Sequence, residues 1–296
     1  MKKFEGINTV LVTAYDEAGN IDRDAMTEIT NFQINSGVHG LVVLGSNGEC
    51  PYLTHDLQKT VIDIVIKSCQ GKLPVIVGIN ERSTDAALEM AAYAKNAGAD
   101  GLLVALHVFY PIEEQDVYRH YETICDQVDI PVLFYNFPSN SHLIFTPEQI
   151  ATISRINKVV GAKETIFKTA EIKALVDATP DDFSVLTGIC FNLTKTMGFG
   201  VCGAICLLPN LVPLMAVQLY EALKAGDLEK AAPLQDKINK LIPIMSTPAP
   251  HAMIKEAMRL LGQPVRAMVK PPLPQLTEDQ AVLVKNTLID AGLLKD

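Results

Sequence analysis

Short apolar segments alternate with longer amphipathic segments along most of the chain. Eight of the short segments are rich in β-branched residues and apolar at almost every position, which is typical of strands that are covered on both faces. They span residues 8–13, 40–44, 74–79, 101–106, 131–135, 159–163, 184–187 and 204–207. Successive segments begin roughly 20 to 35 residues apart, which leaves room for one helix in each gap, so the pattern predicts eight βα units.

The amphipathic segments carry the signals of helix ends. Ser83 stands where an N-cap is expected, and Thr146 is followed by Pro147 at the first helical position. Beyond residue 210 the chain has further amphipathic segments at 211–224, 227–245, 250–261 and 278–291. Eight βα units favour a closed barrel over an open sheet. We therefore predict an α/β fold, with a (β/α)8 TIM barrel that holds the active site over residues 1–210. A C-terminal helical extension, residues 211–296, is expected to pack on the barrel.

Composition and charge narrow the class of protein. The chain has 296 residues, of which 48% are hydrophobic and 20% charged, which is enough apolar material for a large core. A formal net charge of −9 argues against a nucleic-acid partner, because such proteins need a basic surface. The N-terminus lacks the apolar core of a signal peptide, and no window of about 18 residues is apolar enough to span a membrane. We expect a cytoplasmic protein without membrane contacts.

Cysteine usage points the same way. Six cysteines are scattered without a Cys-x-x-Cys pair, so we expect reduced thiols and no metal site.

Reactive side chains stand at the ends of three predicted strands. Lys163 ends one strand, Tyr135 ends the strand before it, and the loop Gly45-Ser-Asn-Gly-Glu49 follows the second strand. The carboxyl ends of barrel strands meet on the face where α/β barrels hold their active sites. Taken singly, the three features are also typical of a surface lysine, a core tyrosine and a tight turn. Together they indicate a lysine that can form a Schiff base, with a phenol nearby to move protons.

The glycine loop is too short for a nucleotide-binding motif, since it lacks a third glycine and a Gly-Lys-Ser/Thr end. Its backbone N–H groups, with the side chains of Ser46 and Asn47, can instead accept a carboxylate. Alternation along the strand places Lys163 on one face with Gly161, a residue that leaves room inside the barrel.

These motifs together resemble those of the dihydrodipicolinate synthase / N-acetylneuraminate lyase family of pyruvate-dependent class I aldolases. The resemblance rests on the glycine loop, on Tyr135-Asn-Phe-Pro138 and on Gly161-Ala-Lys-Glu164, in this order and spacing. It extends into the tail, where Ile254-Lys-Glu-Ala-Met258 and Pro271-Pro272 match as well. The tail looks nearest to the 2-keto-3-deoxygluconate aldolase branch.

The resemblance implies roles for individual residues. Lys163 would form the imine with pyruvate or another 2-oxo acid, and Tyr135, hydrogen-bonded by Ser46, would shuttle protons. Asn47 stands where the family has a threonine or serine that holds the pyruvate carboxylate, and the backbone of Ile205 would contact pyruvate. No metal or cofactor is implied beyond the covalent imine.

The family's quaternary structure implies one more site residue. Family members form homotetramers, as dimers of dimers, in which a neighbouring subunit contributes a tyrosine to the site. Tyr110 matches that tyrosine, and Phe109 competes for the position.

Two departures from the family bear on the substrate. Asn140 replaces the arginine that grips the carboxylate of aspartate semialdehyde in dihydrodipicolinate synthases, and Gly188 is followed by Ile189-Cys-Phe-Asn192 instead of the acidic residues of sialic acid lyases. Polar, uncharged side chains such as His142 stand nearby. We therefore expect reversible cleavage of a 2-keto-3-deoxy sugar acid to pyruvate and an aldehyde.

Three alternatives stay open. The first is dihydrodipicolinate synthase activity with another cation in place of the missing arginine. The second is a dehydratase that acts through the same imine. The third is a non-catalytic sensor that binds a 2-oxo acid on the same scaffold.

Overall fold

The chain folds into a closed barrel of eight parallel strands, as predicted. The computed structural model describes residues 4–247 and 249–295. Each strand pairs with the next along the chain, and the eighth pairs with the first. The strands are β1 (Gly6–Val10), β2 (Gly40–Val43), β3 (Val75–Ile79), β4 (Gly101–Val104), β5 (Val132–Asn136), β6 (Val159–Glu164), β7 (Ser184–Thr187) and β8 (Gly203–Cys206).

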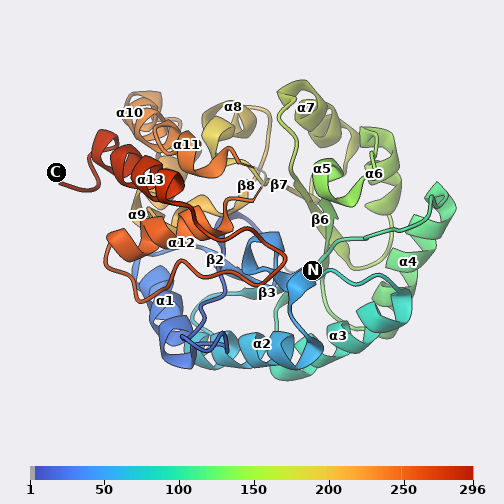
Figure 1. Cartoon of the computed structure of the whole chain (residues 1–296). Coiled ribbons are helices and arrows are strands. Elements are labelled where there is room, and N and C mark those ends of the chain that lie inside the picture. Colours follow the sequence, from blue (N-terminus) through green and yellow to red (C-terminus); the bar gives the residue numbers. More distant parts are fainter. Residues whose placement is uncertain (1–3, 248, 296) are drawn as a thin grey trace.

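Helices surround the barrel and continue beyond it (Figure 1). Those between β1 and β8 are α1 (Arg23–Asn35), α2 (His55–Cys69), α3 (Thr84–Ala97), α4 (Glu114–Gln127), α5 (Pro138–Ser141), α6 (Pro147–Ile153), α7 (Thr169–Ala178) and α8 (Leu193–Met197). After β8 come α9 (Pro213–Lys224), α10 (Leu228–Asn239), α11 (Ile242–Met245), α12 (His251–Leu260) and α13 (Glu278–Asp290). Short 3-10 turns are η1 (Ser46–Gly48), η2 (Cys50–Tyr52), η3 (Cys190–Asn192) and η4 (Leu208–Asn210). In Figure 1 the orange and red helices, α10 to α13, gather on one side of the ring.

The expected caps form. The Ser83 hydroxyl accepts a hydrogen bond from the backbone of Ala86 at the start of α3, and Thr146 and Gln149 form a capping box at the start of α6.

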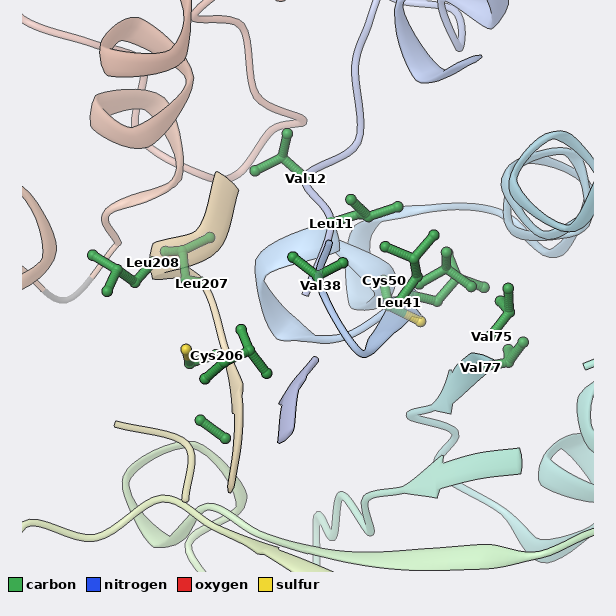
Figure 2. Packing of buried hydrophobic residues seen from close by; sticks show 14 of the residues in the cluster. Leu11, Val12, Val38, Leu41, Cys50, Val75, Val77, Cys206, Leu207 and Leu208 are labelled. Atoms are coloured by element: carbon green, nitrogen blue, oxygen red, sulfur yellow. The ribbon is translucent and has the colours of Figure 1, made fainter. Parts of the chain in front are cut away.

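Alternation along each strand divides the apolar side chains between two layers. On β3, Val75, Val77 and Ile79 pack against the helices, whereas Ile76 points into the barrel. Figure 2 shows Val75 and Val77 on the same side of their strand. Because both faces of each strand are covered, the strands read as continuous apolar runs instead of alternating ones.

Most element boundaries differ from the sequence expectation by one or two residues, and two elements differ more. The first strand begins at Gly6 and ends at Val10, although the apolar run continues; residues beyond it leave the barrel wall, and Thr13 donates a hydrogen bond to the carbonyl oxygen of Gly48 at 2.6 Å. The segment 227–245 forms two helices, α10 and α11, which are separated at Leu241. Helix α9, which follows the expected boundary at residue 210, packs against β1. The division of the chain into a barrel and a C-terminal extension at that residue stays a prediction.

The expectation that all six cysteines are reduced was wrong for two of them. Cys190 and Cys206 form a disulfide, with their Cα atoms 6.5 Å apart. The two cysteines are 16 positions apart, so no local pattern marked the pair, and the pairing of β7 with β8 brings the ends of these strands together.

Within the part of the chain that the structure describes, no helix combines the length and the apolar character needed to cross a membrane.

Candidate active site

Lys163 and Tyr135 are neighbours across two adjacent strands. The register of β5 and β6 pairs the two residues directly, so both side chains point into the barrel. Lys163 is buried, and its Nζ atom lies 4.0 Å from the centre of the Tyr135 ring. A buried amine held against an aromatic face can attack the carbonyl carbon of a 2-oxo acid.

A glycine permits this arrangement. A Cβ atom on Gly161 would lie 2.4 Å from the backbone oxygen of Ser184 and 2.7 Å from Leu133 Cδ2. Gly161 therefore lets β6 approach its neighbours closely, two residues below Lys163. From the sequence we expected Gly161 to leave room inside the barrel; the structure shows that it leaves room for the neighbouring strands.

The Tyr135 hydroxyl connects the strands to the glycine loop. It lies 3.3 Å from Ser46 Oγ, at hydrogen-bonding distance, and the Tyr135 ring stacks on Phe137. Ser46 begins the 3-10 turn η1 immediately after β2, and Asn47 follows it, half-buried. The turn thus presents the serine hydroxyl to the phenol, an arrangement that can pass a proton between the two oxygens.

A cavity of about 110 Å³ opens above this pair. Its lining includes six further side chains that can hydrogen-bond, in addition to Ser46 and Tyr135: Tyr52, Asn80, His107, Asn140, Ser141 and His251. None of the lining residues is a lysine or an arginine. A larger hollow, of about 450 Å³, is lined by residues on and beside α4 and α6 and holds none of the predicted catalytic residues.

Both histidines of the cavity favour the uncharged state. Burial lowers the pKa of His107, and the nearby charge of Arg82 lowers it further. Burial also lowers the pKa of His251, although Glu49 opposes the effect. At neutral pH the cavity therefore presents uncharged hydrogen-bonding groups to whatever it binds.

Lys163 and several other predicted site residues are not among the residues that line the cavity. Ile205 is fully buried inside the barrel, in the apolar layer that also holds Tyr135. Tyr110 is 74% exposed, and its ring packs edge-on against Phe109, so within one chain it stays away from the site. The neighbour-subunit role predicted for it therefore stays a prediction. Asn140 does line the cavity, beside Ser46 and Tyr135.

Gly188 fits closely against the residue that follows β6. Its backbone N–H donates to the carbonyl oxygen of Glu164 at 2.7 Å, and a Cβ atom on it would lie 2.2 Å from Thr165 Oγ1. That threonine hydroxyl is buried and has no hydrogen-bond partner among the described residues. Sequence reasoning missed Thr165, although alternation could have found it, because it stands two residues beyond Lys163 on the same face.

The second residue that sequence reasoning missed comes from the C-terminal helices. His251, the first residue of α12, places Nε2 at 3.2 Å from the carbonyl oxygen of Ser46. The two residues are 205 positions apart, so no local signal marks the contact.

A buried ion pair lies directly behind the glycine loop. Lys255 Nζ donates to the carboxylate of Glu49, and both side chains are fully buried. The second carboxylate oxygen accepts from the Tyr15 hydroxyl at 3.1 Å and from the backbone of Lys270 at 2.7 Å. Lys255 also donates to the carbonyl oxygen of Met268 at 2.7 Å. The network joins the segment that follows β1, the glycine loop, α12 and the segment that follows α12.

Comparisons with known proteins find relatives over nearly the whole chain. Residues 3–291 match the model of the dihydrodipicolinate synthetase family. The chain is 31% identical over 296 residues to a 4-hydroxy-tetrahydrodipicolinate synthase of Methanopyrus kandleri, covering 99% of this chain and 98% of the relative. It is also 31% identical over 299 residues to the Escherichia coli protein named "Probable 2-dehydro-3-deoxy-D-pentonate aldolase YjhH", covering 99% of each.

Among solved structures, the chain resembles YagE of Escherichia coli K12, a member of the dihydrodipicolinic acid synthase family in complex with pyruvate. The TM-score is 0.94 at 29% identity, and the match covers 98% of this chain and 99% of the other.

Proposed function

Since the chain belongs to the dihydrodipicolinate synthetase family, we propose that its Lys163 forms an imine with a 2-oxo acid and that the enzyme cleaves a 2-keto-3-deoxy sugar acid reversibly to pyruvate and an aldehyde. The family identifies the protein as a lyase-type enzyme of the Schiff-base class. The substrate is the part that the proposal adds.

The reaction uses Lys163 and Tyr135 in turn. The Lys163 amine adds to the 2-keto carbon, and the phenol of Tyr135 donates the proton with which the carbinolamine hydroxyl leaves as water, which gives an iminium ion and a phenolate. The C3–C4 bond then breaks: its electron pair moves into the iminium, and the proton of the C4 hydroxyl passes to the phenolic oxygen of Tyr135. The products of this step are an aldehyde and an enamine. Protonation of the enamine at C3 and hydrolysis of the imine release pyruvate and restore the amine. No metal or organic cofactor enters this scheme.

The Ser46 hydroxyl is a second oxygen with which Tyr135 can exchange its proton. At 3.3 Å, its hydroxyl can hydrogen-bond the phenol in either direction. In this scheme Asn47 and the backbone of Ile205 contact the pyruvate part of the substrate, as the family resemblance implies. Gly188 packs against Thr165, whose buried hydroxyl has no hydrogen-bond partner among the described residues and would pair with a substrate hydroxyl in this scheme.

The observation that carries the choice of substrate is the uncharged lining of the cavity. Asn80, His107 and Asn140 offer hydrogen bonds without a positive charge, which suits the hydroxyl groups of a sugar-derived aldehyde. A second carboxylate, as in aspartate semialdehyde, would enter this cavity without the bidentate arginine that such a group needs.

The test is borohydride reduction in the presence of pyruvate, followed by intact-mass measurement and peptide mapping. We expect a reduced pyruvyl adduct on Lys163 and none on the Lys163→Ala variant. Release of pyruvate from a set of 2-keto-3-deoxy pentonates and hexonates should then identify the substrate. If the adduct forms but no sugar acid is cleaved, the enzyme uses the imine for another reaction, such as a dehydration. Failure of the folded protein to form an adduct would contradict the proposal and favour a 2-oxo acid sensor.

Condensation of pyruvate with aspartate semialdehyde is the second candidate. One observation favours it: the exposed Arg82 lies close enough to His107 to lower its pKa, so a cation does stand near the cavity. If Arg82 replaces the missing arginine, aspartate semialdehyde will be consumed with pyruvate, and Arg82→Gln will raise KM for the semialdehyde. If the sugar-acid proposal is right, pyruvate release from the sugar acid will be faster than this condensation, and Arg82→Gln will leave it nearly unchanged.

We further propose that a second copy of the chain covers the exposed apolar side chains near the strand ends. Four of these are more than 70% exposed: Phe109, Tyr110, Ile144 and Phe167. Phe109 and Tyr110 contact each other, and the four residues follow the adjacent strands β4, β5 and β6. Large exposed apolar side chains are typical of protein interfaces. A homotetramer built as a dimer of dimers would place Tyr110 against the neighbouring site. Light scattering of the purified enzyme checks this, and a mass equal to one subunit at micromolar concentration would refute it.

A further inference from the structure

Helix α12 holds the glycine loop through two side chains one turn apart. His251 and Lys255 are separated by four positions, so they lie on the same face of the helix. His251 reaches the backbone carbonyl of Ser46, and Lys255 reaches the carboxylate of Glu49. Ser46 is the first residue of the turn η1 and Glu49 follows its last residue, so the two contacts hold both ends of the turn that carries the serine hydroxyl.

The two contacts reach the carbonyl oxygen of Ser46 by different routes, His251 directly and Lys255 through Glu49. This oxygen accepts a hydrogen bond from the backbone N–H of Glu49 at 3.0 Å and lies 3.2 Å from His251 Nε2. Because a carbonyl oxygen only accepts, Nε2 must carry the proton. Glu49 itself adopts a left-handed backbone conformation, with φ of 61°, at the end of the turn. Its side chain is held on both carboxylate oxygens.

Burying the charges of Glu49 and Lys255 costs free energy of desolvation. Two charges removed from water gain little net stability over apolar residues of the same size. Here the pair anchors Glu49 at the end of the turn, and Ser46, the first residue of the same turn, presents its hydroxyl to Tyr135. We propose that His251 and Lys255 are positioning residues, which act through the turn to hold the Ser46 hydroxyl against Tyr135. The C-terminal helices thereby set the efficiency of proton transfer, an inference that rests on the proposed function.

A double-mutant cycle on kcat tests the proposal. His251→Phe keeps an aromatic ring but removes the N–H donor, and it should lower kcat for sugar-acid cleavage by roughly 10- to 100-fold, because small misplacements of catalytic groups are costly. In a Ser46→Ala background the same substitution should change kcat by less than about twofold, since the hydroxyl that it positions is gone. His251→Gln, whose amide nitrogen has a similar reach, should recover most of the activity.

The matched control is His107→Phe, a change at the other histidine of the cavity lining. The structure records no bond between His107 and the turn, so its effect on kcat should be the same with and without Ser46→Ala. If His251 instead contacted substrate directly, His251→Phe would raise KM and its effects would add to those of Ser46→Ala, which overturns the proposal.

A second variant guards against misfolding. Lys255→Met combined with Glu49→Gln removes both charges without leaving one buried and unpaired. It should lower kcat as His251→Phe does, and again only when Ser46 is present. A loss of thermal stability with an unchanged kcat would show a purely structural role and overturn the proposal.

Borohydride trapping of pyruvate distinguishes a failure of this inference from a failure of the proposed function. Lys163 does not depend on Ser46 to form an imine, so borohydride should trap pyruvate on the His251→Phe variant as fully as on the unaltered enzyme. No adduct on the unaltered enzyme would overturn the proposed function together with this inference. An adduct and turnover with additive effects in the cycle would overturn this inference alone.

Discussion

Replacing Glu164 by glutamine should remove a pH dependence from the free energy of unfolding. Glu164 follows Lys163 on β6 and is 2% exposed. Burial raises the pKa of its carboxyl group to about 7, although two short contacts from the Asn136 amide nitrogen, at 3.0 and 2.9 Å, favour the ionised form. Desolvation therefore outweighs hydrogen bonding at this position.

The sign follows from the proton balance. The unfolded chain loses this proton near the ordinary pKa of 4.5, whereas the folded protein keeps it up to about pH 7. The stability that the group contributes is therefore complete below pH 4.5 and is lost as the pH rises through 7. A pKa difference of this size corresponds to about 3 kcal/mol between the two limits.

Glutamine is a suitable replacement because it resembles the protonated acid and does not titrate. Asn136 Oδ1 is buried and has no hydrogen-bond partner among the described residues, so a turned Asn136 amide can accept from the new side chain. The measurement is urea unfolding of both proteins, at equal concentration, from about pH 5 to about pH 9. The difference in unfolding free energy, unaltered enzyme minus Glu164→Gln variant, should fall as the pH rises and then level off above pH 7. A difference that stays flat, or that rises with pH, would refute the reasoning.

Three further predictions concern the site and its supports. Tyr135→Phe should lower kcat by about 10²- to 10⁴-fold in a steady-state assay and still allow the trapped pyruvate adduct, because the phenol moves protons but forms no covalent bond. Full activity would contradict its assignment as the relay. Gly161→Ala should lower the unfolding free energy by about 1 to 3 kcal/mol, since its Cβ would overlap a backbone oxygen of β7; an unchanged denaturation midpoint would count against that packing. Alkylation after denaturation without reductant should label four of the six cysteines, because Cys190 and Cys206 are paired; label on all six would disprove the pairing.

Local pattern was enough to predict the barrel. Each strand is a short apolar run bounded by turn residues, and each run appears in the structure within a few residues of its expected place. The reason is physical: a strand buried on both faces must be apolar throughout, whatever its neighbours are. The positions of Lys163 and Tyr135 were predicted in the same way, because a residue at the end of such a run lies at the carboxyl end of the barrel.

What lines the site around those two residues was decided by tertiary structure. The contact of His251 with Ser46 spans 205 positions, and the Glu49–Lys255 pair spans 206. The helical pattern of α12 predicts a buried face but not which loop that face meets. Such contacts depend on how the C-terminal helices dock on the closed barrel, and docking sums many long-range contacts that leave no periodic trace in the chain.

The disulfide and the exposed aromatic residues illustrate the same division. Cys190 and Cys206 come together only because the ends of β7 and β8 are neighbours in the closed barrel. Tyr110 was selected from sequence as a site residue, yet within one chain the fold leaves it facing solvent. The sequence by itself therefore determined the strands, the lysine and the tyrosine, because burial and strand direction are local properties. The shape of the cavity, its uncharged lining and the support behind Ser46 required the closed barrel, because they depend on residues that only folding brings together.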